Sequence, residues 1–351
     1  MVLDAQQVEV LSSGRILVIQ TAFPGDSVLA LPFIQELKRL NPGDEIDVVS
    51  APVSAEIFGH SPSVSGVHIF HKRGEHKGGK GLTKFASELR ERKYSRLYSL
   101  HRSFRTTLIM SLAGAQESTG FDIAALSFLY NRRVKYVHND HEVKRNLNML
   151  GDYRDDRWKI MPEVVATGDQ KTRVESFLRG INGGQKTIAI FPGSVWETKR
   201  YPIKYYAEVA AALSSQGQTV VIGGSAAEKE MGAEIIRHSG EKILNLCGEF
   251  SIIESIELLR HVSLVITNDS APTHFAMAAG APVLTIYCST VPEFGFYGYS
   301  TRSHHLTKDV TCKPCGVHGH KKCPTSGFEC GTGLYPYEVL NKVNQILTEN
   351  E

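Results

Sequence analysis

The sequence predicts an α/β protein built from two successive doubly wound parallel sheets. Short apolar runs without alternation, such as residues 15–20 and 264–267, are typical of strands that a parallel sheet buries on both faces. A turn and a segment with helical spacing follow each run, so strands and helices alternate along the chain. The alternation starts again near residue 186. Two such series in 351 residues predict two Rossmann-like domains that face a central cleft.

The first series predicts an N-terminal domain of residues 1–170. Its strands are expected at 15–20, 45–50 and 97–100, with a helix over 28–37. The pattern becomes less regular between residues 120 and 160. A turn-rich linker is expected at 165–185, because Gly180, Gly183 and Gly184 interrupt the chain there.

The second series predicts a C-terminal domain of residues 180–351. Its strands are expected at 186–191, 219–224, 264–267 and 281–287, and its helices at 205–213, 227–238, 252–261, 275–280 and 337–347. In doubly wound sheets, ligands bind at the carboxyl ends of the strands. The strand-to-helix turns are therefore the places to look for function.

The composition is that of an ordinary globular protein, with 42% hydrophobic and 22% charged residues and a formal net charge of +2. That charge gives no bulk attraction to nucleic acid. The first residues lack the basic start and apolar core of a signal peptide, and no apolar run approaches the roughly 18–20 residues that span a bilayer. We expect a cytoplasmic location, with peripheral contact at the inner membrane left open.

Positive charge is concentrated between His71 and Arg105, where eleven Lys or Arg stand against three Glu. One interpretation is a solvated helix face with a flexible loop. The other is a landing surface for an anionic partner, either a phosphorylated acceptor or an anionic membrane leaflet. Few aromatic residues lie among these cations, so nucleic acid fits less well. The candidate acceptor-binding residues are Lys72, Arg73, Arg102 and Arg105.

The segment Thr267–His274 places an acid, a hydroxyl and an imidazole where a buried strand gives way to a helix. The free N–H groups and the dipole of a helix N-terminus favour an anion there. Asp269 and His274 could activate a nucleophile, but the chain has no nucleophile elbow. The alternative is an acid that caps the helix and a histidine at the edge of the core.

Two other turns carry candidate residues. The strand 186–191 ends in Pro-Gly-Ser, and Lys199 follows shortly before a helix, so a diphosphate could accept from Ser194 and be neutralised by Lys199. The alternative is a surface loop, and no Walker A motif is present. Asp26, after Gly25, is either a helix cap or a general base. The absence of GxGxxG argues against a dinucleotide.

Four of the six cysteines lie within residues 312–330, at Cys312, Cys315, Cys323 and Cys330. A structural zinc or iron is one interpretation of such clustering in a cytosolic chain. The spacing is irregular compared with a zinc ribbon, so disulfides and free thiols remain alternatives.

Together, four segments resemble the ADP-heptose:lipopolysaccharide heptosyltransferases, a glycosyltransferase family with the GT-B fold. The segments are 25–32, 191–208, 223–228 and 267–274. The sequences of two segments, Asn268-Asp269-Ser270 and Lys199-Arg200-Tyr201-Pro202, look most similar to those of heptosyltransferase II, which adds the second heptose. Ala271-Pro272 departs from the Gly-Leu of many relatives, and Pro272 has no N–H to offer a phosphate.

The resemblance implies a role for each matching residue. Asp26 would be the catalytic base, and Lys199 would stabilise the departing diphosphate. The donor would be bound by Ser194, Val195, Glu228, Phe250, Asp269, Ser270, Ala271 and His274. Glu228 would meet the ribose, and Phe250 would line the adenine pocket. Some related protein-heptosylating enzymes carry a cysteine-bound iron.

We therefore predict an inverting glycosyltransferase that moves heptose from ADP-heptose to an anionic inner-core acceptor of lipopolysaccharide, with no metal required for catalysis. Three alternatives stay open. The acceptor could be a protein or another surface glycan, the chain could be a sugar-nucleotide epimerase, or it could be a binding module without activity.

Overall fold

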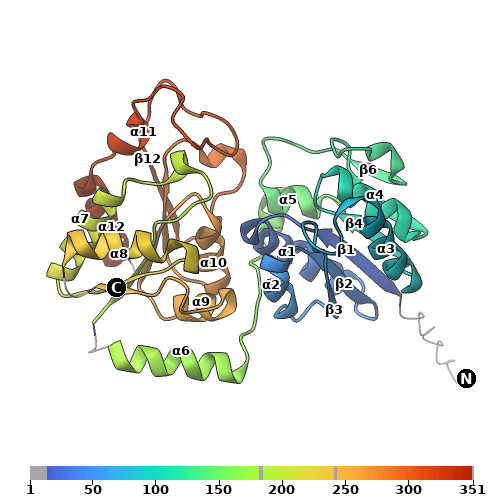
Figure 1. The fold of residues 1–351 in the computed structure, drawn as a ribbon, viewed down its shortest axis with the longest axis horizontal. Helices are drawn as coiled ribbons and strands as arrows, with labels where there is room; N and C mark the ends of the chain where they lie inside the picture. Colours follow the sequence, from blue (N-terminus) through green and yellow to red (C-terminus); the bar gives the residue numbers. More distant parts are fainter. Residues whose placement is uncertain (1–13, 182–184, 241–242, 350–351) are drawn as a thin grey trace, which may run out of the picture. The chain divides into compact units, whose positions relative to one another are not determined.

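The computed structural model describes residues 14–181, 185–240 and 243–349. It contains two six-stranded sheets, and all the strand pairs in them are parallel. The strand orders are β3-β2-β1-β4-β5-β6 and β12-β11-β10-β7-β8-β9. Helices accompany both sheets (Figure 1). The predicted class, two doubly wound parallel sheets, is confirmed.

The first sheet consists of β1 (Arg15–Gln20), β2 (Glu45–Ser50), β3 (Gly66–Ile69), β4 (Arg96–Ser99), β5 (Glu117–Phe121) and β6 (Arg132–Val134). Its helices are α1 (Pro24–Leu40), α2 (Ala55–Gly59), α3 (Gly78–Glu91) and α4 (Phe104–Ala113). The strand order reverses between β1 and β4. The turns after these two strands therefore lie at the topological switch point, where such sheets bind ligands.

The second sheet consists of β7 (Thr187–Phe191), β8 (Thr219–Ile222), β9 (Ile243–Asn245), β10 (Leu264–Asn268), β11 (Val283–Tyr287) and β12 (Ser303–Thr307). The helices along this part of the chain are α5 (Glu142–Leu147), α6 (Gly168–Ile181), α7 (Ile203–Ser215), α8 (Lys229–Ser239), α9 (Ile252–Leu259), α10 (Ala271–Ala279), α11 (Glu329–Thr332) and α12 (Pro336–Glu349). Here the strand order reverses between β10 and β7.

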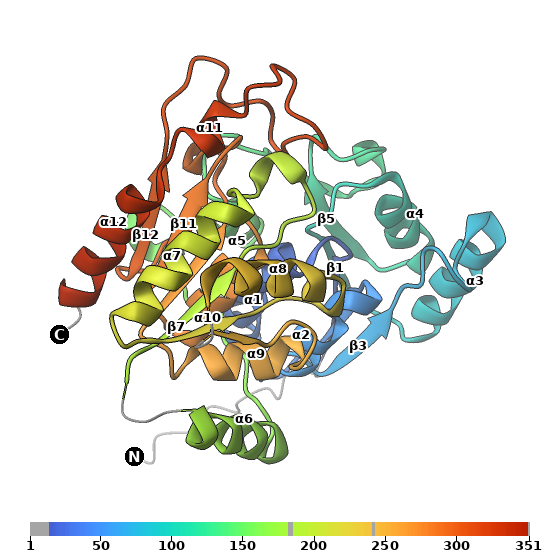
Figure 2. The ribbon, with the colours of Figure 1, turned by 60° about the vertical axis from the view of Figure 1, so that its left-hand side comes forward.

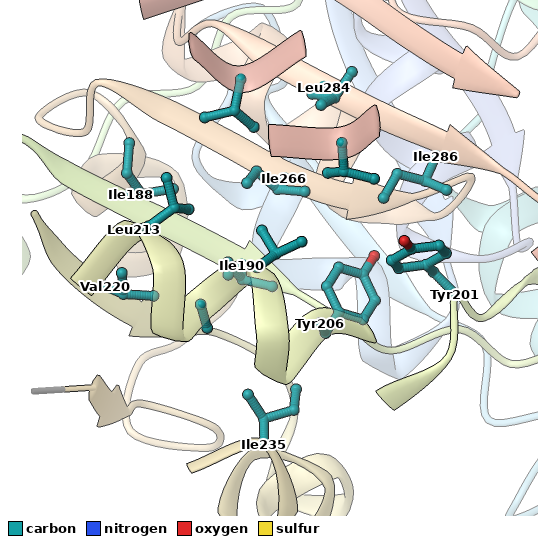
Figure 3. Close-up of a cluster of buried hydrophobic side chains, with 14 of the residues drawn as sticks. Ile188, Ile190, Tyr201, Tyr206, Leu213, Val220, Ile235, Ile266, Leu284 and Ile286 are labelled. Atoms are coloured by element: carbon teal, nitrogen blue, oxygen red, sulfur yellow. The ribbon is translucent and has the colours of Figure 1, made fainter. Parts of the chain in front are cut away.

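A buried apolar cluster joins one face of the second sheet to α7, α8 and α12 (Figures 2 and 3). The strands contribute isoleucine and leucine side chains, and two tyrosines, Tyr201 and Tyr206, fill the end of the cluster. Their hydroxyls are satisfied in the core: Tyr206 donates to Asn268 Oδ1 at 2.9 Å and Tyr201 to the Leu334 carbonyl at 2.8 Å. The core thus reaches directly to the end of strand β10.

Contacts group the chain into two compact units. Unit 1 contains residues up to Ala22 together with Phe33–Tyr136, and unit 2 contains Phe23–Pro32 and Val137–Glu351. The first half of α1 therefore packs in unit 2, where Leu29 joins a cluster with Trp158 and Met277. The segment expected to be a turn-rich linker is largely helical, because α6 runs through it. The domain division between residues 170 and 180 stays a prediction.

His141 is a buried histidine of unit 2 whose two ring nitrogens have fixed roles. Its Nδ1 accepts from the Val143 N–H at 3.2 Å, which caps α5, so Nε2 carries the proton and donates to the Tyr297 carbonyl at 2.9 Å. The ring also stacks on Trp158. Burial lowers the pKa of His141 from 6.5 to about 3. The folded protein therefore holds this side chain neutral.

Acid should destabilise the fold through His141. Below about pH 6.5 the unfolded chain takes up a proton on this residue and the folded chain does not, so the free energy of unfolding falls as the pH falls toward 3. We expect a loss of about 2 kcal/mol from this group between pH 7 and pH 5. Urea unfolding at both values measures it. In His141→Asn, which retains a capping oxygen, this part of the pH dependence should disappear. An unchanged slope in that variant would contradict the assignment.

Candidate active site

Asn268 ties together the two turns that sequence reasoning singled out in the second half of the chain. Its Oδ1 accepts from the Tyr201 N–H and the Tyr206 hydroxyl, both at 2.9 Å, and its Nδ2 donates to the Pro192 carbonyl at 2.6 Å. The side chain is fully buried. The loop after β7 is therefore held against the end of β10. Sequence reasoning gave Asn268 no such role, although an amide at the end of a buried apolar strand is a usable signal.

Lys199 and Asp269 meet where these two turns adjoin. Lys199 Nζ lies 2.5 Å from Asp269 Oδ2 and donates to the Asp269 carbonyl at 3.2 Å. The buried Thr290 hydroxyl donates to the same Oδ2 at 2.7 Å. Both charged side chains are mostly buried, with 14% and 12% of their surface exposed. Thr290 is a member of the site that sequence reasoning missed, because it follows a different strand, β11.

The N-terminus of α10 begins directly after Asp269. Ser270 is the N-cap residue, and its hydroxyl donates to the Gly193 carbonyl at 3.3 Å instead of capping the helix. Within the described part of the chain, the N–H groups of Ser270 and Ala271 have no hydrogen-bond partner. Pro272 occupies the first turn, where a missing N–H costs the helix nothing. Two amides therefore remain available for an anion.

The first turn of α1 packs against the first turn of α10. A Cβ atom on Gly25 would lie 3.1 Å from His274 Cδ2 and 3.4 Å from the Ala271 Cα, so glycine permits this close approach. Asp26 is the next residue and is half-buried. Contact grouping places both in unit 2 with Lys199 and Asp269. The N-terminal dipoles of two helices thus favour negative charge in the same region.

His274 is buried beneath this pair of helix ends. Burial lowers its pKa from 6.5 to about 4; nearby Lys199 acts in the same direction and Asp269 in the opposite one. Among the described residues, its Nδ1 atom has no hydrogen-bond partner. A neutral imidazole with a spare ring nitrogen can exchange a hydrogen bond with a ligand hydroxyl or a water molecule.

Glu228 and Ser194 both lie next to Gly193, which is in the turn that follows β7. Glu228 Oε2 accepts from the Ser225 N–H at 2.6 Å and from the Ser225 hydroxyl at 2.7 Å, which closes a capping box. Its other oxygen lies so close to Gly193 that a Cβ there would be 1.6 Å from it. Ser194 is half-buried, and its carbonyl accepts from Arg200 Nε at 2.7 Å.

Two predicted donor residues lie outside this network of contacts. Val195 is 66% exposed and contributes to no core cluster. The Phe250 ring packs edge-on against Phe177 of α6 at 5.3 Å, and the Arg173 guanidinium lies over it at 5.2 Å. A nucleobase at Phe250 would share the ring with Arg173, a neighbour that sequence reasoning did not identify.

The predicted acceptor cations belong to unit 1. Lys72 Nζ donates to the Thr21 carbonyl at 3.1 Å, and Arg105 donates to the Lys72 carbonyl at 3.3 Å. Burial, with Arg73 and Arg105 nearby, lowers the pKa of Lys72. Arg102 lies over the Tyr136 ring at 4.3 Å. Lys72 therefore lies at the residue that follows β1, and Arg73 and Arg105 lie near Lys72.

The four clustered cysteines are free thiols. Across residues 14–181, 185–240 and 243–349, no group of three or more His, Cys, Asp or Glu side chains is arranged to hold a metal ion. The cysteine segment instead packs against the Lys199 loop: the buried Thr198 donates its N–H to the His320 carbonyl at 3.1 Å and accepts from the His320 N–H at 2.8 Å. The segment thus supports the loop that presents Lys199.

Known proteins resemble this chain over nearly its whole length. Lipopolysaccharide heptosyltransferase 2 of Escherichia coli K12 is 25% identical, over 96% of this chain and 99% of that protein. Two solved structures each match 96% of this chain. The structure of E. coli ADP-heptose lps heptosyltransferase II has a TM-score of 0.79 and 24% sequence identity, and 99% of that chain is covered. The structure of a family 9 glycosyltransferase from Veillonella parvula has a TM-score of 0.84 and 20% sequence identity, and 98% of that chain is covered.

A family model, that of glycosyltransferase family 9 (heptosyltransferase), matches residues 82–325. This range includes the loops with Ser194, Lys199, Glu228 and Asp269, and the likeness of the solved structures extends the same GT-B-like fold over nearly the whole chain. The chain belongs to glycosyltransferase family 9 and is a heptosyltransferase.

Proposed function

We propose that this heptosyltransferase moves heptose from ADP-heptose to the inner core of lipopolysaccharide, with inversion at the anomeric carbon. The observation that carries the proposal is the cradle formed by Lys199, the Ser270 and Ala271 amides and the adjoining first turn of α1. The free N–H groups, the two helix dipoles and the Lys199 ammonium, which Asp269 contacts in this structure, suit a diphosphate. The name of the E. coli relative supports the same substrate class.

In the proposed reaction, Asp26 accepts the proton of the acceptor hydroxyl while that oxygen bonds to the anomeric carbon. The bond from this carbon to the diphosphate oxygen breaks, and its electron pair leaves with ADP. Lys199 and the α10 amides stabilise the negative charge that develops there. Asp269 would bind donor hydroxyls, and Glu228 the ribose. We assign Lys72, Arg73, Arg102 and Arg105 to the anionic acceptor.

We further propose that the transfer needs no metal cofactor, since Lys199 and the amides supply charge stabilisation. Transfer in the presence of EDTA tests this. The four cysteines are not arranged to hold a metal in the described residues, so we expect elemental analysis of the purified protein to find neither zinc nor iron.

A transfer screen tests the substrate assignment. ADP-, UDP- and GDP-sugars would be offered with Kdo-containing acceptors that carry no heptose or one heptose, and the new linkage would be assigned by NMR. We expect transfer from ADP-heptose alone. Conversion of the donor without acceptor would indicate an epimerase, and transfer only to protein would redirect the acceptor assignment.

Gly193→Ala should weaken ADP binding by at least about tenfold, because the new methyl group must displace the Glu228 carboxylate from its present position. Calorimetric titration with ADP measures the effect. Gly180→Ala is the matched control, since a Cβ at that helical position of α6 meets no atom within 4 Å. Wild-type affinity in Gly193→Ala would exclude Glu228 from the nucleotide site.

A further inference from the structure

Thr198, the residue before Lys199, is buried and is bonded to two distant segments of unit 2. Its N–H donates to the His320 carbonyl at 3.1 Å, and its hydroxyl accepts from the His320 N–H at 2.8 Å. The same hydroxyl donates to the buried Ser289 hydroxyl at 3.0 Å, and the Thr198 carbonyl accepts from the Ser289 N–H at 3.2 Å. The backbone that carries Lys199 is therefore fixed from the end of β11 and from the cysteine segment.

The cysteine segment is in turn bonded to the residues that follow β11. The Cys315 N–H donates to the Ser289 carbonyl at 3.0 Å. The His320 ring closes the loop 315–320, because its Nε2 lies 2.7 Å from the Cys315 carbonyl, and a carbonyl oxygen can only accept. Loop 315–320, Ser289 and Thr198 are therefore joined in one hydrogen-bonded framework.

Gly319 brings this loop against the side chain of Lys199. A Cβ atom on Gly319 would lie 3.3 Å from Lys199 Cγ, 3.0 Å from Thr198 Oγ1 and 2.9 Å from Ser289 Oγ. The φ angle of Gly319 is +75°, a conformation that glycine adopts without strain. The backbone of the loop therefore packs on the methylene chain of Lys199 and limits the directions in which its ammonium can point.

The same framework also holds the partner of Lys199. Thr290 directly follows Ser289, and its hydroxyl donates to Asp269 Oδ2 at 2.7 Å. Lys199 is thus held through Thr198, and Asp269 through Thr290, from two adjacent residues at the end of β11. The geometry of the Lys199–Asp269 pair therefore depends on how this strand end is fixed.

We propose that Thr198, Ser289 and His320 are positioning residues that direct the Lys199 ammonium at the departing diphosphate. This inference rests on the role of Lys199 under the proposed function. Stabilisation of the charge that develops on a leaving group depends on a cation that is already in place, and a misplacement of about 1 Å can cost about a hundredfold in rate. Loop 315–320 would thus contribute to the reaction through Lys199, without touching either substrate.

Thr198→Val tests the proposal, because valine keeps the shape of the side chain and removes the hydroxyl that joins Ser289 to His320. We expect kcat for transfer to fall at least about tenfold while ADP affinity stays within about threefold of the wild type. Thr198→Ser retains a hydroxyl and should recover most of the lost kcat. In a Lys199→Ala background, Thr198→Val should cause no further loss of kcat, since it acts through that lysine. An equal loss in both backgrounds would indicate a purely structural role and overturn the proposal.

Gly319→Ala and Gly316→Ala form a second, matched pair. Both glycines have a positive φ, so alanine is strained at either position, but a Cβ on Gly316 meets no described atom within 4 Å. We expect a lower kcat in Gly319→Ala than in Gly316→Ala. Equal kcat in the two, or normal kcat in Thr198→Val while Lys199→Ala is defective, would overturn the positioning role and leave the proposed function standing. Normal kcat in Lys199→Ala would remove Lys199 from the mechanism, and the positioning role with it.

Discussion

Asp26→Asn should reduce kcat for heptosyl transfer by about 10²–10⁴ while the affinity for ADP stays close to that of the wild type. The amide keeps the size of the side chain and cannot accept the proton of the acceptor hydroxyl. Because Asp26 is half-buried in the first turn of α1, next to the glycine that packs on His274, the substitution leaves the packing of the two helices intact. Steady-state transfer assays and calorimetry measure the two quantities.

The same variant decides between the two interpretations of Asp26. An acid in the first turn of a helix stabilises it through the helix dipole by about 0.3–1 kcal/mol, and asparagine would lose that contribution. A purely structural role therefore predicts a small drop in the melting temperature with nearly normal kcat. Normal turnover in Asp26→Asn would remove Asp26 from the mechanism.

The fold could be predicted where strands lie inside a sheet and could not at the edges. All seven predicted strands are present as β1, β2, β4, β7, β8, β10 and β11, each flanked by two neighbours. Four of the five that were missed are the edge strands β3, β6, β9 and β12, and the fifth, β5, lies between β4 and β6. Inner strands are buried on both faces and read as apolar runs. The missed strands carry polar residues, as in the sequence Ser-His-His-Leu-Thr of β12.

The candidate site could be predicted turn by turn but not as an assembly. Each strand-to-helix turn can be recognised in the sequence because Gly, Ser, Asp or Lys follows an apolar run. The contacts that join the turns depend on which strands pair. Because β10 lies beside β7, Asn268 at the end of β10 reaches the loop that follows β7. The approach of Gly25 to His274 spans most of the chain, and no local pattern encodes it. The same holds for Thr290 and for the support that His320 gives Thr198.

Lys199→Ala should weaken ADP binding and lower kcat by about 10²–10³, because it removes the cation nearest to the proposed diphosphate position. It also leaves the Asp269 carboxylate, which is mostly buried and which, among the described residues, only Thr290 would then hold, to repel that diphosphate. Lys204→Ala, an exposed lysine at the start of α7, is the control and should behave as the wild type. Unchanged ADP affinity in Lys199→Ala would count against the cradle.

A double variant separates the two causes. If repulsion by Asp269 contributes to the defect, Lys199→Ala combined with Asp269→Asn should bind ADP more tightly than Lys199→Ala alone, since the unpaired charge is gone. Transfer should not recover with it, because the leaving group still lacks its cation and the donor sugar has lost a carboxylate partner. A double variant that binds ADP no better than Lys199→Ala would mean that the ion pair has no role in nucleotide affinity. The effect of Lys199 would then be its direct contact with the diphosphate, and the close Lys199–Asp269 pair would only orient the lysine before the donor arrives.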